Sequence, residues 1–412
     1  GFDVIHGYKT ILPIPLGESA SWDLDILAHS SAIAATEASA SGLNWTFAPM
    51  LDISRDARWG RVMEGGGEDT YLSTQIGVAR IKGFQGNDLS QPYTIAACAK
   101  HFAGYGFAEA GKEYNTVDIG TSTLFNMVLP PFKAASESGV KTFMNSFNDL
   151  NGIPVSASKY LQRDILKTKW DFEGFVVSDW ASINEIISWG YAKDKKEAAK
   201  IASLAGSDMD MEGHVYIQEL VNLVKEGVVE EAIINDAVKR ILKVKYELGL
   251  FDDPYKYCNT KNEMERIGSK AHLEDALDMA KKSIVLLKNE TQLLPLKKEG
   301  QKIALIGPLA ADKNSPLGSW RTASEDHTAI SVLEGMKTYT GNALEYSKGI
   351  DLIIGQTSFI KEVYINTTNR DGIKEAVEVA KNADVVVMVL GEHGFQSGEA
   401  RSRTQLDLPG LQ

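Results

Sequence analysis

The feature that most limits the possible folds of this chain is an alternation of short apolar runs with amphipathic segments, continuing to about residue 250. The apolar runs are typical of buried strands and lie at 45–51, 94–101, 140–146, 174–178 and, less clearly, 205–211. Helical patterns fall between them at 24–40, 70–84, 121–138, 159–168, 197–205 and 228–248. This βαβα order predicts a parallel sheet, and the length fits a closed barrel of about 250 residues. We therefore predict a TIM-like (β/α)8-type barrel over residues 1–252.

Polar side chains follow most of these apolar runs. They are Asp3, Asp52, Lys100, His101, Asn145, Asp179 and Asp208. An open doubly wound sheet would gather its polar strand ends near one switch point. Polar groups after nearly every strand therefore favour the closed barrel, whose active sites lie at the carboxyl ends of the strands.

One strand end is notable because a buried apolar run ends in an acid next to an indole. The run 174–178 leads into Asp179 and Trp180. A carboxylate at this place lies where barrel enzymes carry out their chemistry, and the adjacent indole can stack on the face of a sugar. The alternative is structural, with Ser178 or Asp179 capping a helix that begins near Ala181.

Two further segments carry residues suited to binding polar ligands. Residues 55–69 are dense in arginine, acids and glycine, and the fixed fork of an arginine such as Arg61 suits hydroxyls or carboxylates. The alternative for these charges is a solvated loop held by salt bridges. Lys100 and His101 end a strand and can hold hydroxyls, although a Schiff-base lysine or a buried structural histidine would give the same pattern.

A second domain is expected after a polar, irregular linker at 253–271. The remaining residues, 272–412, show a helical pattern at 272–283 and 371–381 and apolar runs at 284–289, 302–308 and 384–392. The chain opens inside an apparent strand and stops soon after another. We therefore expect that the first barrel element is missing and that the second domain, an α/β sandwich, is truncated.

Composition excludes several classes of partner. The net charge of −12 argues against nucleic acid and anionic membranes, and no apolar run reaches the roughly 18 residues of a membrane span. Two distant cysteines give neither a zinc spacing nor a disulfide framework. Asp208 and Asp210 lack a third ligand, so we expect no metal and no cofactor. The oligomeric state stays open.

Taken together, the motifs resemble glycoside hydrolase family 3, most of all its bacterial periplasmic β-glucosidase branch. The resemblance covers nearly the whole chain and includes Phe2–Gly7, Arg58–Arg61, Lys100–Phe102, Tyr114–Asn115, Val177–Asp179, Leu317–Trp320 and Gly391–Glu392. It implies a retaining, exo-acting β-glucosidase in the periplasm or outside the cell. No histidine lies between His101 and His214, which disfavours the N-acetylglucosaminidase branch, because that branch has a histidine acid within the barrel.

The resemblance also implies roles for individual residues. Asp179 would be the nucleophile, and the acid/base would come from the second domain, where Glu399 is preferred to Glu392 because it stands in the matching segment 397–403. A retaining mechanism needs these carboxyls about 5–5.5 Å apart, with Asp179 ionised and the pKa of the acid raised. The sugar would be held by Asp3, Arg61, Lys100, His101, Tyr114, Met144 and Trp180.

Other functions remain as alternatives. A β-xylosidase or a mixed-specificity β-glycosidase of the same family differs only in the shape of the pocket around the sugar C6. A Schiff-base aldolase would use Lys100, and a catalytically inactive relative would bind carbohydrate without turnover. The sugar, the linkage and the aglycone are not determined by these residues.

Overall fold

The centre of the first domain is a parallel sheet made of β1 (Cys98–Phe102), β2 (Thr142–Asn145) and β5 (Phe175–Val177), in that order. The computed structural model describes residues 1–412. Isolated parallel bridges extend the sheet on both sides, and they join Phe2 to Thr46, Trp45 to Ala96, and Val177 to Met209. The parallel segments thus follow chain order, as the βαβα pattern predicts. No recorded bridge joins the last segment to the first, so the structure shows an α/β domain without showing that the barrel closes.

Helices cover this sheet, and their ends have identifiable causes. α3 (Thr70–Gln85) packs between α2 (Leu24–Ala40) and α5 (Leu129–Glu137). The carboxylate of Asp23 accepts a hydrogen bond from the Ile26 N–H at the start of α2, and Asp69 does the same for Leu72 in α3. These caps explain why the predicted helices 24–40 and 70–84 match the observed ones closely.

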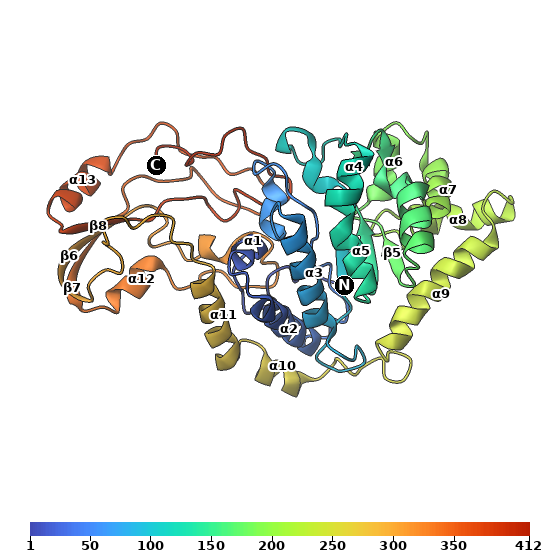
Figure 1. The fold of residues 1–412 in the computed structure, drawn as a ribbon, viewed down its shortest axis with the longest axis horizontal. Coiled ribbons are helices and arrows are strands. Elements are labelled where there is room, and N and C mark those ends of the chain that lie inside the picture. Colours follow the sequence, from blue (N-terminus) through green and yellow to red (C-terminus); the bar gives the residue numbers. More distant parts are fainter.

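The remaining elements of the first domain are shorter or lie at its outer side (Figure 1). They are α1 (Pro15–Ser19), α4 (Thr121–Thr123), the hairpin of β3 (Asp149–Leu150) and β4 (Ile153–Pro154), α6 (Ser182–Ser188), α7 (Lys195–Ala205), α8 (Val215–Lys225) and α9 (Glu231–Glu247). Residues 124–128 and 160–169 form π-helical turns. No helix combines the length and the apolar character needed to cross a bilayer.

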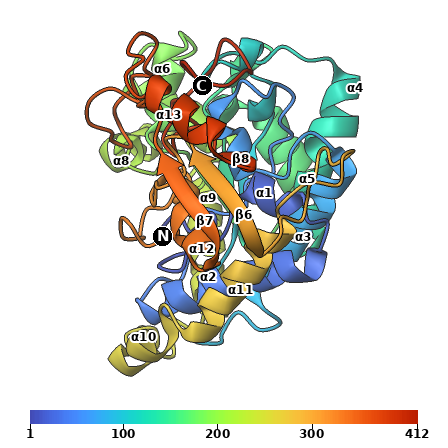
Figure 2. The same cartoon turned by 90° about the vertical axis from the view of Figure 1, so that its left-hand side faces the viewer.

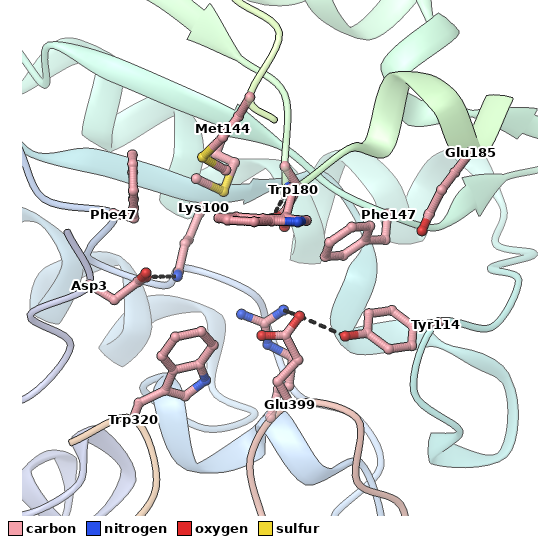
Figure 3. A pocket seen from close by; sticks show the side chains of 13 residues that line it. Asp3, Phe47, Lys100, Tyr114, Met144, Phe147, Trp180, Glu185, Trp320 and Glu399 are labelled. Atoms are coloured by element: carbon pink, nitrogen blue, oxygen red, sulfur yellow. Dashed lines mark hydrogen bonds and ion pairs between the residues drawn. The ribbon is translucent and has the colours of Figure 1, made fainter. Parts of the chain in front are cut away.

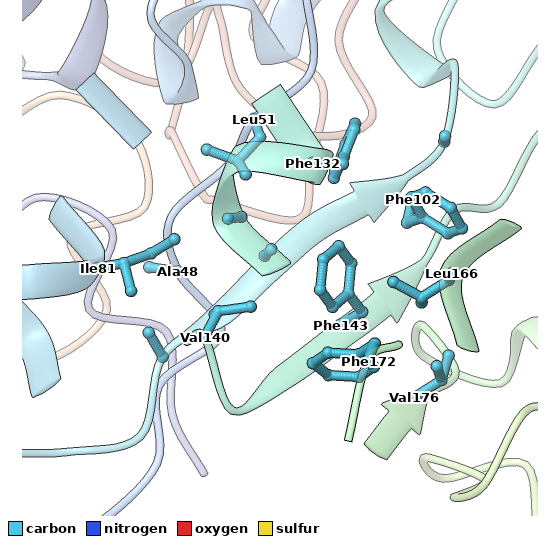
Figure 4. Close-up of a cluster of buried hydrophobic side chains, with 14 of the residues drawn as sticks. Ala48, Leu51, Ile81, Phe102, Phe132, Val140, Phe143, Leu166, Phe172 and Val176 are labelled. Carbon is cyan, nitrogen blue, oxygen red and sulfur yellow. The ribbon is translucent and has the colours of Figure 1, made fainter. Parts of the chain in front are cut away.

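The main core fills the space between the sheet and the helices, and aromatic rings form its middle (Figure 4). Phe143 is fully buried and lies edge-on to Phe102 at 5.5 Å and to Phe172 at 4.8 Å between ring centroids. Phe132 meets Phe102 in the same way at 5.4 Å. Edge-to-face pairs of this kind add to the free energy gained by burying the rings. The core thereby fixes β1 relative to β2, and both strands deliver residues to the site.

The segment that connects the domains is more ordered than the expected irregular linker. It contains α10 (Thr260–Arg266), and α11 (Lys270–Lys282) follows it. Met279 of α11 is buried against Leu12, Leu27 and Ile76 of the first domain. The helix predicted at 272–283 is therefore present but packs on the first domain, whereas the sequence assigns it to the second. The boundary at 271 stays a prediction.

The second domain is built on a parallel sheet of order β7-β6-β8, formed by Gly341–Ser347, Glu299–Ile306 and Val385–Met388 (Figure 2). Its helices are α12 (Val332–Lys337) and α13 (Ile373–Lys381). The predicted runs 302–308 and 384–392 both contain strands: β6 starts three residues before its run, and β8 covers only part of its run. The run 284–289 is not a strand here, because it lies exposed and pairs with no neighbour. A small core of Ala304, Ile306, Ala376 and Val379 joins the sheet to α13.

Phe143 offers a direct test of the core. Replacing it with alanine removes a fully buried ring from the edge-to-face cluster, and we expect Phe143→Ala to lower the free energy of unfolding by about 3–5 kcal/mol. Urea unfolding followed by circular dichroism measures this change. Ile217→Ala is the control, because Ile217 is 81% exposed and its loss should change stability by less than about 0.5 kcal/mol. Equal effects of the two substitutions would contradict this description of the core.

Candidate active site

A cavity of about 410 Å³ opens where the carboxyl ends of the first-domain strands face the second domain (Figure 3). Lys100 comes from β1, Met144 from β2, and Asp179 follows β5 by two residues. Every residue predicted to bind or act on a sugar lines this cavity except His101. The full lining is Asp3, Phe47, Arg61, Lys100, Tyr114, Met144, Phe147, Asp179, Trp180, Glu185, Met211, Trp320 and Glu399.

Asp179 faces the cavity and does not cap a helix. Its Oδ1 accepts a hydrogen bond of 2.7 Å from the Trp180 N–H, which fixes the carboxyl plane. α6 begins at Ser182, and no side chain caps its N-terminus. The alternative in which Asp179 serves only as a helix cap is therefore wrong. The second oxygen, Oδ2, has no hydrogen-bond partner and lies 3.6 Å from Nε2 of His101.

His101 lies behind Asp179, fully buried, and is held by Asp52. Asp52 Oδ2 is 2.8 Å from His101 Nδ1 and also accepts the His101 backbone N–H at 2.9 Å. Burial lowers the pKa of His101 well below its usual range, and the charges of Arg61 and Lys100 lower it further. The ring is therefore neutral. With its proton on Nδ1 facing Asp52, it presents the lone pair of Nε2 toward the site.

Lys100 and Asp3 form an ion pair on one side of the cavity, with 3.0 Å between Nζ and Oδ1. Burial lowers the pKa of Lys100, but the charges of Asp3 and Glu64 outweigh it and leave the pKa above its usual range. A Schiff-base lysine must lose its proton before it attacks a carbonyl, and its pKa is normally depressed. The charged state of Lys100 therefore argues against the aldolase alternative and suits a residue that holds hydroxyls.

Arg61 is fixed by two residues that sequence analysis did not place in the site. Its Nε donates to Glu64 Oε1 at 2.8 Å and its Nη2 to Glu64 Oε2 at 3.1 Å, and both side chains are buried. Trp320 of the second domain donates from Nε1 to Glu64 Oε1 at 2.7 Å. This arrangement leaves Arg61 Nη1 to face Glu399, 3.4 Å from its Oε1.

Glu399 reaches the cavity on a loop that pairs with the first domain through backbone hydrogen bonds. The Gly398 N–H donates to the Gly60 carbonyl at 2.6 Å, and the Gly60 N–H donates to the Arg401 carbonyl at 3.0 Å. A Cβ on residue 60 would lie 2.4 Å from both the Gly398 and the Arg401 carbonyl oxygens. Only glycine allows this approach, which explains the glycine within the arginine-rich segment.

The side chain of Glu399 is held inside the cavity, whereas the competing acid is not. The Tyr114 hydroxyl donates to Glu399 Oε1 at 2.7 Å. Glu392 instead forms an ion pair with Arg403 outside the cavity. The structure therefore brings Glu399, and not Glu392, together with Asp179.

The two acids share one electrostatic environment. The pKa of Asp179 is raised to about 8, chiefly by burial; the charge of Arg61 opposes the rise, the negative charge of Glu399 adds to it, and Lys100 opposes it. Asp179 is therefore mostly protonated at neutral pH. The expectation of an ionised Asp179 is therefore wrong for this structure, because the charges of Arg61 and Lys100 do not offset the burial of the carboxyl.

Several buried polar atoms of the site make no hydrogen bond. They include His101 Nε2, Asp179 Oδ2 and Arg61 Nη1, although Arg61 Nη1 lies within ion-pair distance of Glu399. Buried polar atoms are nearly always hydrogen-bonded, so atoms left open at a cavity mark where a polar ligand binds. A donor, an acceptor and a carboxylate oxygen together suit a ligand with several hydroxyl groups. No group of three His, Cys, Asp or Glu side chains is placed to hold a metal ion.

Five lining residues were not predicted from the sequence: Phe47, Phe147, Glu185, Met211 and Trp320. Glu185 lies near the start of α6, directly after the Asp179 segment, so helical spacing could have suggested it. Phe47 and Met211 lie in apolar runs where nothing distinguishes a cavity residue from a core residue. Trp320 comes from the second domain, and only its place in the family-like motif Leu317–Trp320 could have pointed to the site.

Comparison with known proteins gives matches over nearly the whole chain. Residues 1–244 match the family described as Glycosyl hydrolase family 3 N terminal domain, and residues 284–412 match Glycosyl hydrolase family 3 C-terminal domain. A periplasmic beta-glucosidase of Salmonella typhimurium is 41% identical over 99% of this chain and 55% of its own length. A beta-xylosidase of Formosa agariphila is 34% identical over 99% of this chain and 57% of its own length.

The fold is also close to that of a solved enzyme structure. The beta-glucosidase of Listeria innocua in complex with isofagomine matches with a TM-score of 0.92 and 39% identity, over 99% of this chain and 55% of that chain. The chain therefore spans little more than half the length of the relatives that it matches.

The raised pKa of Asp179 predicts a pH-dependent cost in stability. Its folded-state pKa lies above the unfolded value of about 4, so wild-type stability falls as pH rises from about 4 toward 8. We expect Asp179→Asn to escape this loss, with its advantage in unfolding free energy growing by up to about 1.4 kcal/mol per pH unit across that window. Urea unfolding at several pH values measures it. The exposed Asp164→Asn is the control, and a pH-independent difference for Asp179→Asn would contradict the prediction.

Proposed function

Because the chain belongs to glycoside hydrolase family 3, we propose that the protein hydrolyses terminal, non-reducing β-D-glucosyl residues with retention of configuration. The observation that carries this proposal is the meeting of Asp179 and Glu399 in one cavity, beside buried polar atoms that lack partners. These two acids come from different domains, and each is held by a hydrogen bond to one of its oxygens.

In the first step, Asp179 attacks the anomeric carbon through Oδ2 while the bond from that carbon to the leaving oxygen breaks. Glu399 gives its proton to the leaving oxygen, so the aglycone departs neutral and a glycosyl ester remains on Asp179. The proposed step therefore requires an ionised Asp179 and a protonated Glu399 when the sugar is bound. Arg61 favours the ionised form of Asp179 and lies against Glu399, so it can stabilise either acid as the charge moves.

In the second step, Glu399 takes a proton from water, and the resulting hydroxide attacks the anomeric carbon and releases Asp179. This double displacement requires a carboxyl separation of about 5–5.5 Å, which leaves no room for water between acid and sugar in the first step. The retaining outcome stays a proposal, and the configuration of the first-formed sugar, read by proton NMR, tests it.

The sugar would be gripped on the side of the cavity opposite Tyr114 (Figure 3). Asp3 and Lys100 offer an acceptor and a charged donor to adjacent hydroxyls, and neutral His101 offers Nε2 as an acceptor. Trp180 is 62% exposed, which leaves its ring face free to stack on a sugar. Met144 lines the cavity on the β2 side.

The proposal also covers the closure of the barrel and the location of the protein. The sequential parallel order of strands supports a closed (β/α)8-type barrel for the first domain. The similarity to a periplasmic beta-glucosidase supports a location in the periplasm or outside the cell.

A β-xylosidase or mixed β-glycosidase is the second candidate, because beta-xylosidases are among the relatives. Hydrolysis of a panel of 4-nitrophenyl β-glycosides separates the two. We expect kcat/KM for the β-glucoside to exceed that for the β-xyloside by about 10-fold or more, since burying the extra C6 group is worth about 1–3 kcal/mol. A preference for the xyloside would overturn the assigned sugar. Binding of glucose without turnover of any glycoside would instead identify an inactive relative.

The nucleophile can be identified by trapping. A 2-deoxy-2-fluoro-β-glucoside with a reactive leaving group should inactivate the protein and leave one fluoroglucosyl group on Asp179, because fluorine slows both steps and the reactive leaving group speeds up only the first. Peptide mass spectrometry locates the label. Asp179→Asn should lose at least about 1000-fold in kcat and take up no label, whereas Asp164→Asn should behave as wild type. Label on another acid would overturn the role of Asp179.

A further inference from the structure

A buried acid outside the cavity contacts the loop that carries Glu399. Glu113 belongs to a first-domain segment that runs beside residues 397–403, and its side chain is buried. The Ala400 N–H, directly after Glu399, donates to Glu113 Oε2 at 3.2 Å. The Glu113 backbone N–H in turn donates to the Ser402 hydroxyl at 2.8 Å. One residue thus touches the catalytic loop through both its side chain and its backbone.

The carboxylate of Glu113 is oriented by the first domain. Its Oε1 accepts hydrogen bonds from Trp59 Nε1 at 3.1 Å and from the Tyr114 N–H at 3.2 Å. Oε1 therefore faces the first domain, and Oε2 is left for the loop. Trp59 is itself buried, so the orientation is fixed by groups that have little freedom to move. The neighbouring Tyr114 holds the carboxyl of Glu399 directly.

The loop needs such support at this point. Ala400 has φ of +59°, a left-handed conformation that non-glycine residues adopt at a cost in energy. Backbone pairing with Gly60 ties the loop through residues 398 and 401, and pairing with Arg58 ties it through residue 403, but neither reaches Ala400. The Glu113 carboxylate is the group that binds the strained peptide next to Glu399.

We propose that Glu113 is a positioning residue that holds the Ala400 peptide and thereby aims the carboxyl of Glu399 at the leaving oxygen. The proposal rests on Glu399 being the acid/base, as proposed above. It assigns Glu113 no contact with the substrate and no proton transfer. Its loss should weaken acid catalysis while leaving the binding of the sugar intact.

Glu113→Gln is the sharpest variant, because an amide has one acceptor where the carboxylate has two. Its oxygen will face the two first-domain donors, so its NH2 group will face the Ala400 N–H and break that contact. We expect kcat to fall about 10- to 100-fold for cellobiose, whose leaving group needs a proton, with KM nearly unchanged. For 2,4-dinitrophenyl β-glucoside, whose leaving group needs none, kcat should fall less than about threefold.

The controls separate this proposal from the one that it rests on. Glu109→Gln changes an exposed acid in the same segment and should behave as wild type on both substrates. Glu399→Gln should show the same dependence on the leaving group more strongly. If Glu399→Gln shows none, Glu399 is not the acid and the proposed function fails. If Glu399→Gln shows it and Glu113→Gln matches Glu109→Gln, only the role of Glu113 is overturned.

Hydrogen exchange gives a readout that does not depend on turnover. In Glu113→Gln, backbone amides of residues 397–402 should exchange at least about tenfold faster, with the rest of the protein unchanged. Unaltered exchange there would contradict the proposal. Should Glu113→Gln fail to fold, Ser402→Ala is the second variant, because it removes the hydrogen bond between the Glu113 backbone N–H and the loop. We expect the same preference for 2,4-dinitrophenyl β-glucoside, with a smaller difference in kcat between the two substrates. Equal activity of Ser402→Ala and wild type on both substrates would then overturn the proposal.

Discussion

The pocket depends on backbone pairing between a loop of the first domain and a loop of the second. Residues 58–60 and 398–403 exchange hydrogen bonds that resemble a short antiparallel ladder. The two domains have separate cores, so packing within either one places only its own carboxyl. The pairing fixes where Glu399 stands relative to Asp179, and it requires the close approach that Gly60 permits. Contacts of Tyr114 and Arg61 then set the direction of the carboxyl.

The buried charged groups of the pocket lower the stability of the fold, as is typical of functional sites. Asp179 is a buried acid whose neighbours include both a second acid and two cations. Burial and Glu399 favour its neutral form, whereas Arg61 and Lys100 favour the anion, so small changes on ligand binding can move the proton. A protein selected only for stability would not bury such a set, and conflicts of this kind are expected at functional sites.

The sequence predicted those elements whose position depends on residues close together in the chain. The helix at 24–40 has a capping aspartate and a clear end, and Asp179 follows a short buried strand, so both could be read directly. The roles of Asp52 and Trp320 could not, because their partners His101 and Glu64 are distant in sequence. The run 284–289 was expected to be a strand, but an apolar run becomes a strand only where a neighbour pairs with it.

About half of the chain lies between Asp179 and Glu399. At ordinary rates of translation, the second acid is made on the order of ten seconds or more after the first. Within that interval, the emerging first domain carries Asp179, while Glu399, which lines the same cavity, has not yet been made. The cavity is therefore incomplete in a ribosome-bound intermediate. It can be completed only late, after residues 398–403 exist and can pair with residues 58–60.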